Sequence, residues 1–378
     1  MVGTTTRTGR MVAMSPRLPA HRTSPVGPGV GTVETKYATV ATPDDPLHLI
    51  AGGRLDHVTV AYETYGTLNE ARDNAVYICH ALTGDAHAAG FHPGADRPGW
   101  WDNIIGPGRA IDTNRFFVIS SNLLGGYSGT TGPASINPDT GKRWGLDFPQ
   151  IDMHDFVEVH LRLAQYLGVE HFHAVIGGSM GGARTLEWTL MYPEAVDAAC
   201  VIAVSARASA WQIGIQSAQI SAIERDPFWH GGDYYSSSQR PREGLAAARR
   251  IAHLTYRGEQ EIDERFGASA QQGENPLGPH RQLNQRFAVN SYLDYQGRKL
   301  TERFDAGSYV TLTEALNRHD VGRGRGGLIK ALAASQVPTM VVGVDTDILY
   351  PYHQQEHLSR NLGNLLAMAK VVSPVGHD

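Results

Sequence analysis

The chain has 378 residues, 41% of them hydrophobic and 19% charged, which is typical of a globular protein with ample material for a core. Its net charge of -5 gives no reason to expect a nucleic acid as a partner. It contains no apolar run of about 18 residues, as a transmembrane helix would need, and its two cysteines make no disulfide framework. These features favour a cytoplasmic protein that binds no membrane.

The first stretch, residues 1–33, is rich in threonine, arginine, proline and glycine. It has basic residues but lacks the apolar centre of a secretory signal. We therefore predict a disordered N-terminal extension over residues 1–33.

From residue 34 to 205 the pattern alternates between strands and helices, which predicts an α/β core. Residues 33–65 favour antiparallel strands, and residues 57–62 alternate like a half-buried strand. Continuous apolar runs typical of a parallel sheet follow at 75–79, 115–120, 174–176 and 198–204, with helices expected over 151–168 and 182–192.

The stretch Gly177-Gly178-Ser179-Met180-Gly181 lies between an expected strand and an expected helix. In that context Gly-x-Ser-x-Gly is typical of a nucleophile elbow, where a serine sits on a strained turn. The amide of Met180 would then point at the oxygen of a bound carbonyl. The alternative is a glycine-rich turn that cradles a phosphate.

After residue 205 the alternation of strands and helices stops, and the expected elements are helices. Residues 206–335 are rich in expected helices, over 211–224, 244–255, 286–304 and 309–317. We interpret this block as an insertion that covers the sheet as a lid. Strands resume at 337–343 and 369–372, with a helix at 353–362 between them, so that residues 336–378 complete the core. Asp347 follows the first of these strands and His377 the second, and the order serine, aspartate, histidine is that of α/β-hydrolases. Asp345 is a rival for Asp347.

Seven motifs together carry a specific resemblance. They are His80-Ala81-Leu82-Thr83-Gly84-Asp85, Asn122-Leu123-Leu124-Gly125-Gly126, Gly177-Gly178-Ser179-Met180-Gly181-Gly182, Ala206-Arg207-Ala208-Ser209-Ala210-Trp211-Gln212, Arg249-Arg250-Ile251-Ala252-His253-Leu254-Thr255-Tyr256-Arg257, Arg303-Phe304-Asp305-Ala306-Gly307-Ser308-Tyr309 and Asp347-Ile348-Leu349-Tyr350-Pro351. With them the chain resembles the homoserine O-acetyltransferases of methionine biosynthesis, especially the actinobacterial ones, from about residue 33 to its end. Members of that family continue past the catalytic histidine with a final helix, whereas this sequence ends at Asp378.

The resemblance implies an α/β-hydrolase fold with a mostly parallel sheet and a helical lid. It implies Ser179 as nucleophile, His377 as general base and acid, Asp347 as the group that orients His377, and the amides of Leu82 and Met180 as oxyanion hole. Acetyl-CoA would acylate Ser179, and the hydroxyl of L-homoserine would then take the acetyl group. Homoserine O-succinyltransferase and serine esterase remain the alternatives.

For substrate binding, the resemblance places Arg249 on the homoserine carboxylate and Asp378 on its ammonium group, with Tyr256 nearby. Arg249 and Tyr256 are about two helical turns apart, so they can share a face. Arg249 or its neighbour Arg250 is alternatively a surface cation. The family implies no cofactor apart from acetyl-CoA as substrate, no metal, and a homodimer formed by lid helices.

Two further motifs are interpreted without a functional site. His353-Gln354-Gln355-Glu356-His357 matches a zinc pattern, but no third ligand is apparent. Gly322-Arg323-Gly324-Arg325-Gly326-Gly327 matches a dinucleotide pattern, but no strand precedes it. We interpret its arginines as part of a solvated loop or as a contact for the phosphates of CoA.

Overall fold

A computed structural model describes residues 29–279 and 285–378. Most of the expected N-terminal extension, residues 1–28, lies outside the described part. Its last residues belong to the folded region, because Val30 and Val33 pack on a small hydrophobic cluster and the Val33 amide donates to Phe91 O at 2.9 Å. Residues 29–33, the end of the expected extension, therefore contact the folded region.

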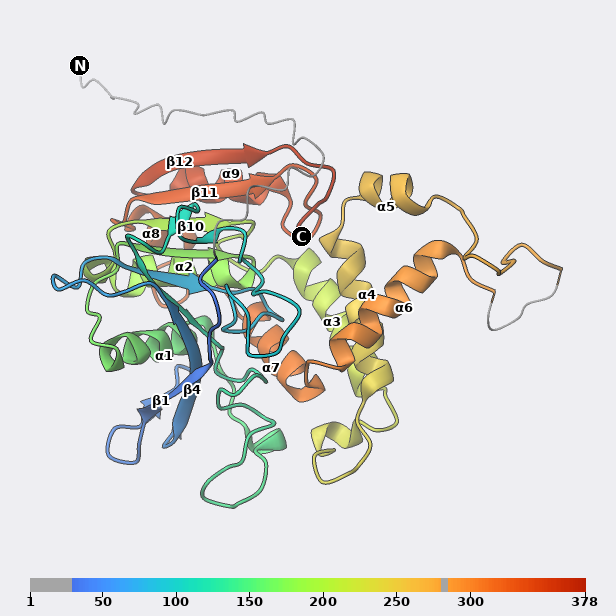
Figure 1. Cartoon of the computed structure of the whole chain (residues 1–378), viewed down its shortest axis with the longest axis horizontal. Helices are drawn as coiled ribbons and strands as arrows, with labels where there is room; N and C mark the ends of the chain where they lie inside the picture. The colour runs from blue at the N-terminus through green and yellow to red at the C-terminus, as the bar shows by residue number, and fades with distance from the viewer. Residues whose placement is uncertain (1–28, 280–284) are drawn as a thin grey trace.

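One eight-stranded sheet forms the centre of the fold (Figure 1). In spatial order its strands are β1 (Lys36–Ala41), β4 (Val58–Tyr65), β8 (Phe117–Ser121), β5 (Ala75–Cys79), β9 (Ala174–Gly178), β10 (Ala199–Ile202), β11 (Thr339–Val344) and β12 (Leu365–Val371). The pairs β1–β4 and β4–β8 are antiparallel, and all other neighbours are parallel. Two short ladders lie outside the sheet, β2 (Leu47–His48) with β3 (Arg54–Leu55) and β6 (Ile105–Gly106) with β7 (Ile111–Asp112).

The interior strands are apolar because neighbouring elements cover both their faces. All five residues of β5 are buried. Strand β4, expected to be half-buried, is mostly buried as well, since it lies between β1 and β8. The covering helices are α1 (Met153–Tyr166), α2 (Met180–Met191), α8 (Leu328–Ala333) and α9 (Tyr352–Asn361). Helix α2 packs on β5, β9 and β10, and α9 packs on β11 and β12.

The helical block between β10 and β11 contains α3 (Ala210–Glu224), α4 (Arg242–Tyr256), α5 (Glu259–Phe266), α6 (Ala288–Thr301) and α7 (Ala306–Asn317). We call this block the lid. Helix α4 packs against α3 and α6, and the group projects from one end of the sheet (Figure 1). Side-chain caps begin two of the helices, Ser209 for α3 and Asp305 for α7.

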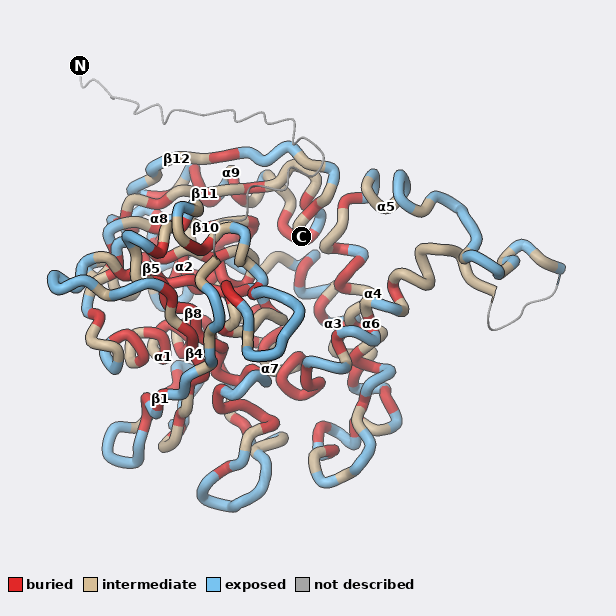
Figure 2. Tube along the Cα trace, viewed as in Figure 1, coloured by how far each residue is buried: buried red, intermediate tan, exposed pale blue. Residues whose placement is uncertain are grey.

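The two ends of the lid meet at its base. Arg207 and Asp320 form an antiparallel bridge, the Ala208 amide donates to His319 O at 2.8 Å, and the Val321 amide donates to Ala206 O at 3.0 Å. Buried residues are concentrated in the sheet and the helices that cover it, and they continue into the inner turns of the lid (Figure 2).

Candidate active site

Ser179 stands on a tight turn between β9 and α2, with φ 56° and ψ −126°. Side chains rarely adopt this conformation, and the surrounding backbone leaves room only for glycine. A Cβ added at Gly181 would overlap the carbonyl oxygen of Cys79, and one at Gly177 would overlap that of Gly181. The sequence expectation of an elbow is therefore met in its backbone geometry.

Asp347 and His377 are in direct contact. Asp347 is buried just after β11, and its Oδ1 accepts the amides of Leu349 and Tyr350, each at 2.8 Å. Its Oδ2 lies 2.7 Å from His377 Nδ1. Because an ionised carboxylate can only accept, Nδ1 is the donor, and Nε2 of His377 is left as the nitrogen that can take a proton. The rival Asp345 instead accepts the amide of Ser373 at 3.1 Å.

Ser179 and His377 line one cavity of about 850 Å³ at the carboxyl ends of the central strands. The loop after β5, the stretch 97–101, and residues of α4 and α6 complete its walls. The ring of His377 lies between two tyrosines, with ring centroids 5.4 Å from Tyr350 and 5.9 Å from Tyr256. The nucleophile and the base therefore face the same enclosed volume, with the lid as one wall.

The two predicted oxyanion amides belong to segments that meet at the elbow. Leu82 lines the cavity from the loop after β5, and Met180 is the first residue of α2. The first amides of a helix have no partner within the helix, and the helix dipole favours negative charge there. Leu82 therefore lines the same cavity as Ser179, and Met180 directly follows Ser179 in the chain; their role as oxyanion donors stays a prediction.

Arg184 connects these two segments, and sequence reasoning missed it. It is fully buried in α2, its Nη2 donates to His80 O, and its Nε donates to Met180 O at 3.4 Å. Burial lowers the pKa of Arg184, and burial beside this guanidinium lowers the pKa of His80 to about 3. The sequence did contain a signal for Arg184, because a lone arginine stands among the apolar residues of the expected helix over 182–192.

The predicted binding residues Arg249 and Tyr256 share a face of α4. Both line the cavity, and the Arg249 guanidinium carbon lies 5.2 Å from the centroid of the Tyr256 ring. Arg250 is not among the lining residues, and it forms an ion pair with Asp294 on α6 at 3.0 Å. Of the two arginines, Arg249 is therefore the one that lines the cavity.

Asp378 also lines the cavity. Its amide donates to Tyr256 O at 3.0 Å, which fixes it beside the predicted carboxylate-binding face. Its carboxylate lies 3.7 Å from Arg257 Nη2, so part of its charge is already balanced. Three further cations line the cavity and were not singled out from the sequence, namely Arg97, Lys299 and Arg303.

The arginines of the 322–327 stretch are not among the residues that line this cavity, so the lining gives no support to the suggested contact with CoA phosphates. Arg325 forms an ion pair with the buried Glu187 at 2.8 Å, and Arg323 pairs with Asp152 at 3.0 Å. His353 and His357 line a second cavity of about 670 Å³ beside α9. Among the described residues, the zinc-like motif on α9 does not assemble a group of three ligands.

Comparison with known proteins gives consistent matches. Residues 74–378 match the model of the alpha/beta hydrolase fold family. The homoserine O-acetyltransferase of Corynebacterium diphtheriae is 64% identical over 328 residues, which cover 87% of this chain and 86% of the relative. That of Thermobifida fusca is 51% identical, with 88% and 87% covered.

Solved structures give the same picture for the fold. The homoserine O-acetyltransferase of Bacillus anthracis superposes with a TM-score of 0.82 at 28% identity, covering 92% of this chain and 93% of the other. The structure of esterase E22 superposes with a TM-score of 0.82 at 31% identity, covering 91% and 95%. One architecture thus serves both a transferase and an esterase.

Proposed function

Because the chain belongs to the homoserine O-acetyltransferase family and has the alpha/beta hydrolase fold, we propose that it transfers the acetyl group of acetyl-CoA to the hydroxyl of L-homoserine, a step of methionine biosynthesis, through an acetyl ester of Ser179. The observation that carries the proposed route is the elbow serine in one cavity with the paired His377 and Asp347.

In the first half-reaction, Ser179 Oγ attacks the thioester carbonyl while His377 Nε2 takes its proton. The negative charge that develops on the carbonyl oxygen is stabilised by the amides of Leu82 and Met180, and each such donor is typically worth about 3 kcal/mol. His377 returns the proton to the sulfur as the carbon–sulfur bond breaks, and CoA leaves as a thiol. Asp347 holds the required tautomer of His377 throughout.

In the second half-reaction, the homoserine hydroxyl loses its proton to His377 Nε2 and attacks the acetyl-serine. The ester bond to Ser179 breaks, and the proton passes to Ser179 Oγ. Water competes for the same acyl group, so the lid wall of the cavity serves to exclude it.

Charge on the cavity wall supports the proposed substrates. The planar fork of Arg249 suits the homoserine carboxylate, and the carboxylate of Asp378 suits the ammonium group. Arg97, Lys299 and Arg303 add positive charge at the same cavity, which suits the phosphates of CoA. Arg303 is held in place by donating to Thr83 O at 2.7 Å.

The similarity to esterase E22 supports hydrolysis as the second candidate, and succinyl transfer is the third activity that the same fold can carry. Incubation with acetyl-CoA or succinyl-CoA, with and without homoserine, separates the three. With acetyl-CoA alone we expect release of at most one CoA thiol per chain, and continued release only when homoserine is also present. CoA release from succinyl-CoA but not from acetyl-CoA would overturn the assignment. So would cleavage of simple esters at a rate that homoserine does not change.

Ser179→Ala tests the covalent route. We expect loss of CoA release and of the acetyl adduct on the protein by mass spectrometry, because members of such a triad act as a unit. The matched control is Ser209→Ala at the N-cap of α3, outside the cavity, which should keep the adduct. Turnover by the Ser179 variant near that of the wild type would show that the elbow is only structural.

We also propose a homodimer formed through lid helices. Trp211, Leu254 and Tyr295 are about half exposed on α3, α4 and α6, more apolar surface than the cover of one cavity needs. Light scattering should give twice the chain mass, and a Leu254→Glu, Tyr295→Glu double variant should shift it towards one chain. A wild-type monomer at working concentration would contradict the proposal.

We place the reaction in the cytoplasm. Both cysteines, Cys79 and Cys200, are free thiols, as is usual in a reducing compartment. Among the described residues, no helix is long and apolar enough to cross a membrane. Fractionation of cells that express the tagged protein tests the assignment, and recovery outside the cytoplasmic fraction would contradict it.

A further inference from the structure

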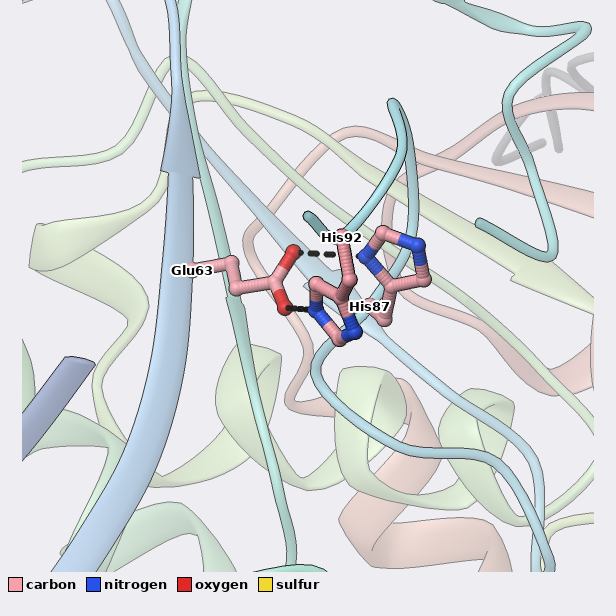
Figure 3. A group of neighbouring side chains, drawn as sticks. All are labelled: Glu63, His87 and His92. Carbon is pink, nitrogen blue, oxygen red and sulfur yellow. Dashed lines mark hydrogen bonds and ion pairs between the residues drawn. The ribbon is translucent and has the colours of Figure 1, made fainter. Parts of the chain in front are cut away.

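A buried carboxylate and two histidines form a cluster (Figure 3). One of the histidines, His87, also lines the active-site cavity. Glu63 projects from β4 and is only 1% exposed. Its Oε2 lies 3.0 Å from His87 Nδ1, and its Oε1 lies 2.7 Å from His92 Nε2. The two imidazole rings stack with centroids 3.7 Å apart, so both rings present a nitrogen to the same carboxylate.

We propose that Glu63, His87 and His92 bind one divalent transition-metal ion, for which Zn²⁺ is the best match. Two imidazoles and one carboxylate are a ligand set that zinc accepts readily, with further positions open to water. Metal bonds of about 2.0–2.2 Å place neighbouring donor atoms roughly 3 Å apart. The nitrogen–oxygen distances in the cluster are already in that range. The site departs from the sequence expectation of no metal.

The carboxylate is held for this role by two further hydrogen bonds. Tyr65 OH donates to Oε2 at 2.8 Å, and Thr35 Oγ1 donates to Oε1 at 3.0 Å. A carboxylate has enough lone pairs to keep both bonds while it binds a metal. Hydrogen bonds of this kind orient ligands and are part of most metal sites.

The loop that carries both histidines is fixed by its backbone as well. The amide of His87 donates to Asp85 Oδ1 at 3.0 Å. The amide of Phe91 donates to Gly31 O at 3.0 Å, and Phe91 O accepts the amide of Val33 at 2.9 Å. The ligand positions are therefore set without the metal, which reduces the entropy lost when the metal binds.

The role that follows is structural. Leu82, Asp85 and Trp100 belong to the same stretch of chain and line the cavity. A metal would tie this wall to Glu63 on β4, an interior strand of the sheet. We therefore expect the metal to stabilise the cavity wall without contact with the acyl group.

The test is direct binding to the whole chain after removal of metal with a chelator. Zn²⁺ is titrated by calorimetry, and Co²⁺ by its visible absorption, which changes with the coordination geometry of the ion. We expect one saturable ion per chain and a midpoint of thermal unfolding that rises with Zn²⁺. His92→Ala should weaken binding at least tenfold, and Glu63→Gln should do the same. These readouts do not depend on acetyl transfer.

The matched control is His171→Ala. His171 also pairs with a carboxylate, Asp197, at 2.7 Å, but both side chains are exposed. This variant should bind Zn²⁺ as the wild type does. The proposal would be overturned by an absence of saturable binding, or by equal affinity of the wild type and His92→Ala. Either result would show that the three side chains are joined by hydrogen bonds and bind no metal. Loss of binding in the His171 control would place the ion elsewhere, with the same consequence.

Discussion

Ser179 combines an L side chain with a positive φ of 56°. The backbone strain of such a residue is typically about 1–3 kcal/mol, and a glycine would not pay it. We predict that Ser179→Gly has a free energy of unfolding about 1 kcal/mol higher than Ser179→Ala, although both lack the nucleophile. Urea unfolding of the two inactive variants measures the difference.

The control for this comparison is Gly214 in the interior of α3, where an added Cβ meets nothing within 4 Å. There alanine should be the more stable residue, by up to about 1 kcal/mol. If alanine were the better residue at both positions, the conformation of Ser179 would carry no strain.

Arg249 and Arg250 are neighbours on α4, and only Arg249 lines the cavity. We predict that Arg249→Lys leaves acylation by acetyl-CoA largely intact but weakens use of homoserine by about 2 kcal/mol or more, because lysine cannot bind a carboxylate with a planar fork. Single-turnover acylation beside steady-state titration of homoserine measures both effects.

Arg250→Lys is the matched control and should leave both half-reactions unchanged. Asp378→Asn should resemble Arg249→Lys if the ammonium group lies there. Lost acylation with normal homoserine dependence in either active-site variant would assign that residue to the CoA part of the site.

The proposed triad could be predicted from the sequence because each member follows a strand in a recognisable order. Arg184 and Glu63 were not, because their importance depends on contacts across the fold. Arg184 is two residues beyond the elbow motif, which ends at Gly182, yet its guanidinium donates to the carbonyl oxygen of His80. Glu63 is far in sequence from His87 and His92, and burial of β4 turns it into the core instead of towards solvent.

At the scale of elements, an ion pair joins α2 to the segment after α7. Glu187 is 1% exposed on α2, and Arg325 lies 2.8 Å from it. We predict that Arg325→Ala lowers the free energy of unfolding by about 3–5 kcal/mol. The buried carboxylate loses its close cation and keeps only His154, whose Nε2 lies 3.6 Å away. The exposed pair of Arg360 and Glu356 on α9 is the control, and Arg360→Ala should cost less than about 1 kcal/mol. Equal costs in denaturant titrations would show that burial of Glu187 is unimportant.

The helices were predicted with different success, for physical reasons. The amphipathic spacing of α1 placed it within a few residues of its actual bounds. Helix α7 begins at Ala306, three residues before the expected start at Tyr309, because Asp305 caps it and a glycine in its first turn hides the pattern. Helix α5 was missed, since its eight largely charged residues bury none of their side chains.

At the scale of the whole molecule, the sheet and the lid share one hydrophobic cluster. It contains Val175 and Val341 from the sheet and Leu245, Leu300 and Tyr309 from the lid. We predict one cooperative transition in calorimetry, with Leu245→Ala lowering its midpoint as a whole through a loss of about 2–5 kcal/mol. A variant in which the lid melts separately, below an unchanged second transition, would contradict this shared core.

The bridge between Arg207 and Asp320 has an evolutionary consequence. Because the chain enters and leaves the lid side by side, insertions or deletions between these points alter a closed loop and cost the sheet little. The strands that carry Ser179, Asp347 and His377 keep their connections whatever that loop contains. Such an arrangement lets the part of the acceptor site on α4, with Arg249 and Tyr256, change independently of the residues that perform the chemistry. A descendant could move from an amino-acid acceptor towards water by remodelling the enclosed segment first.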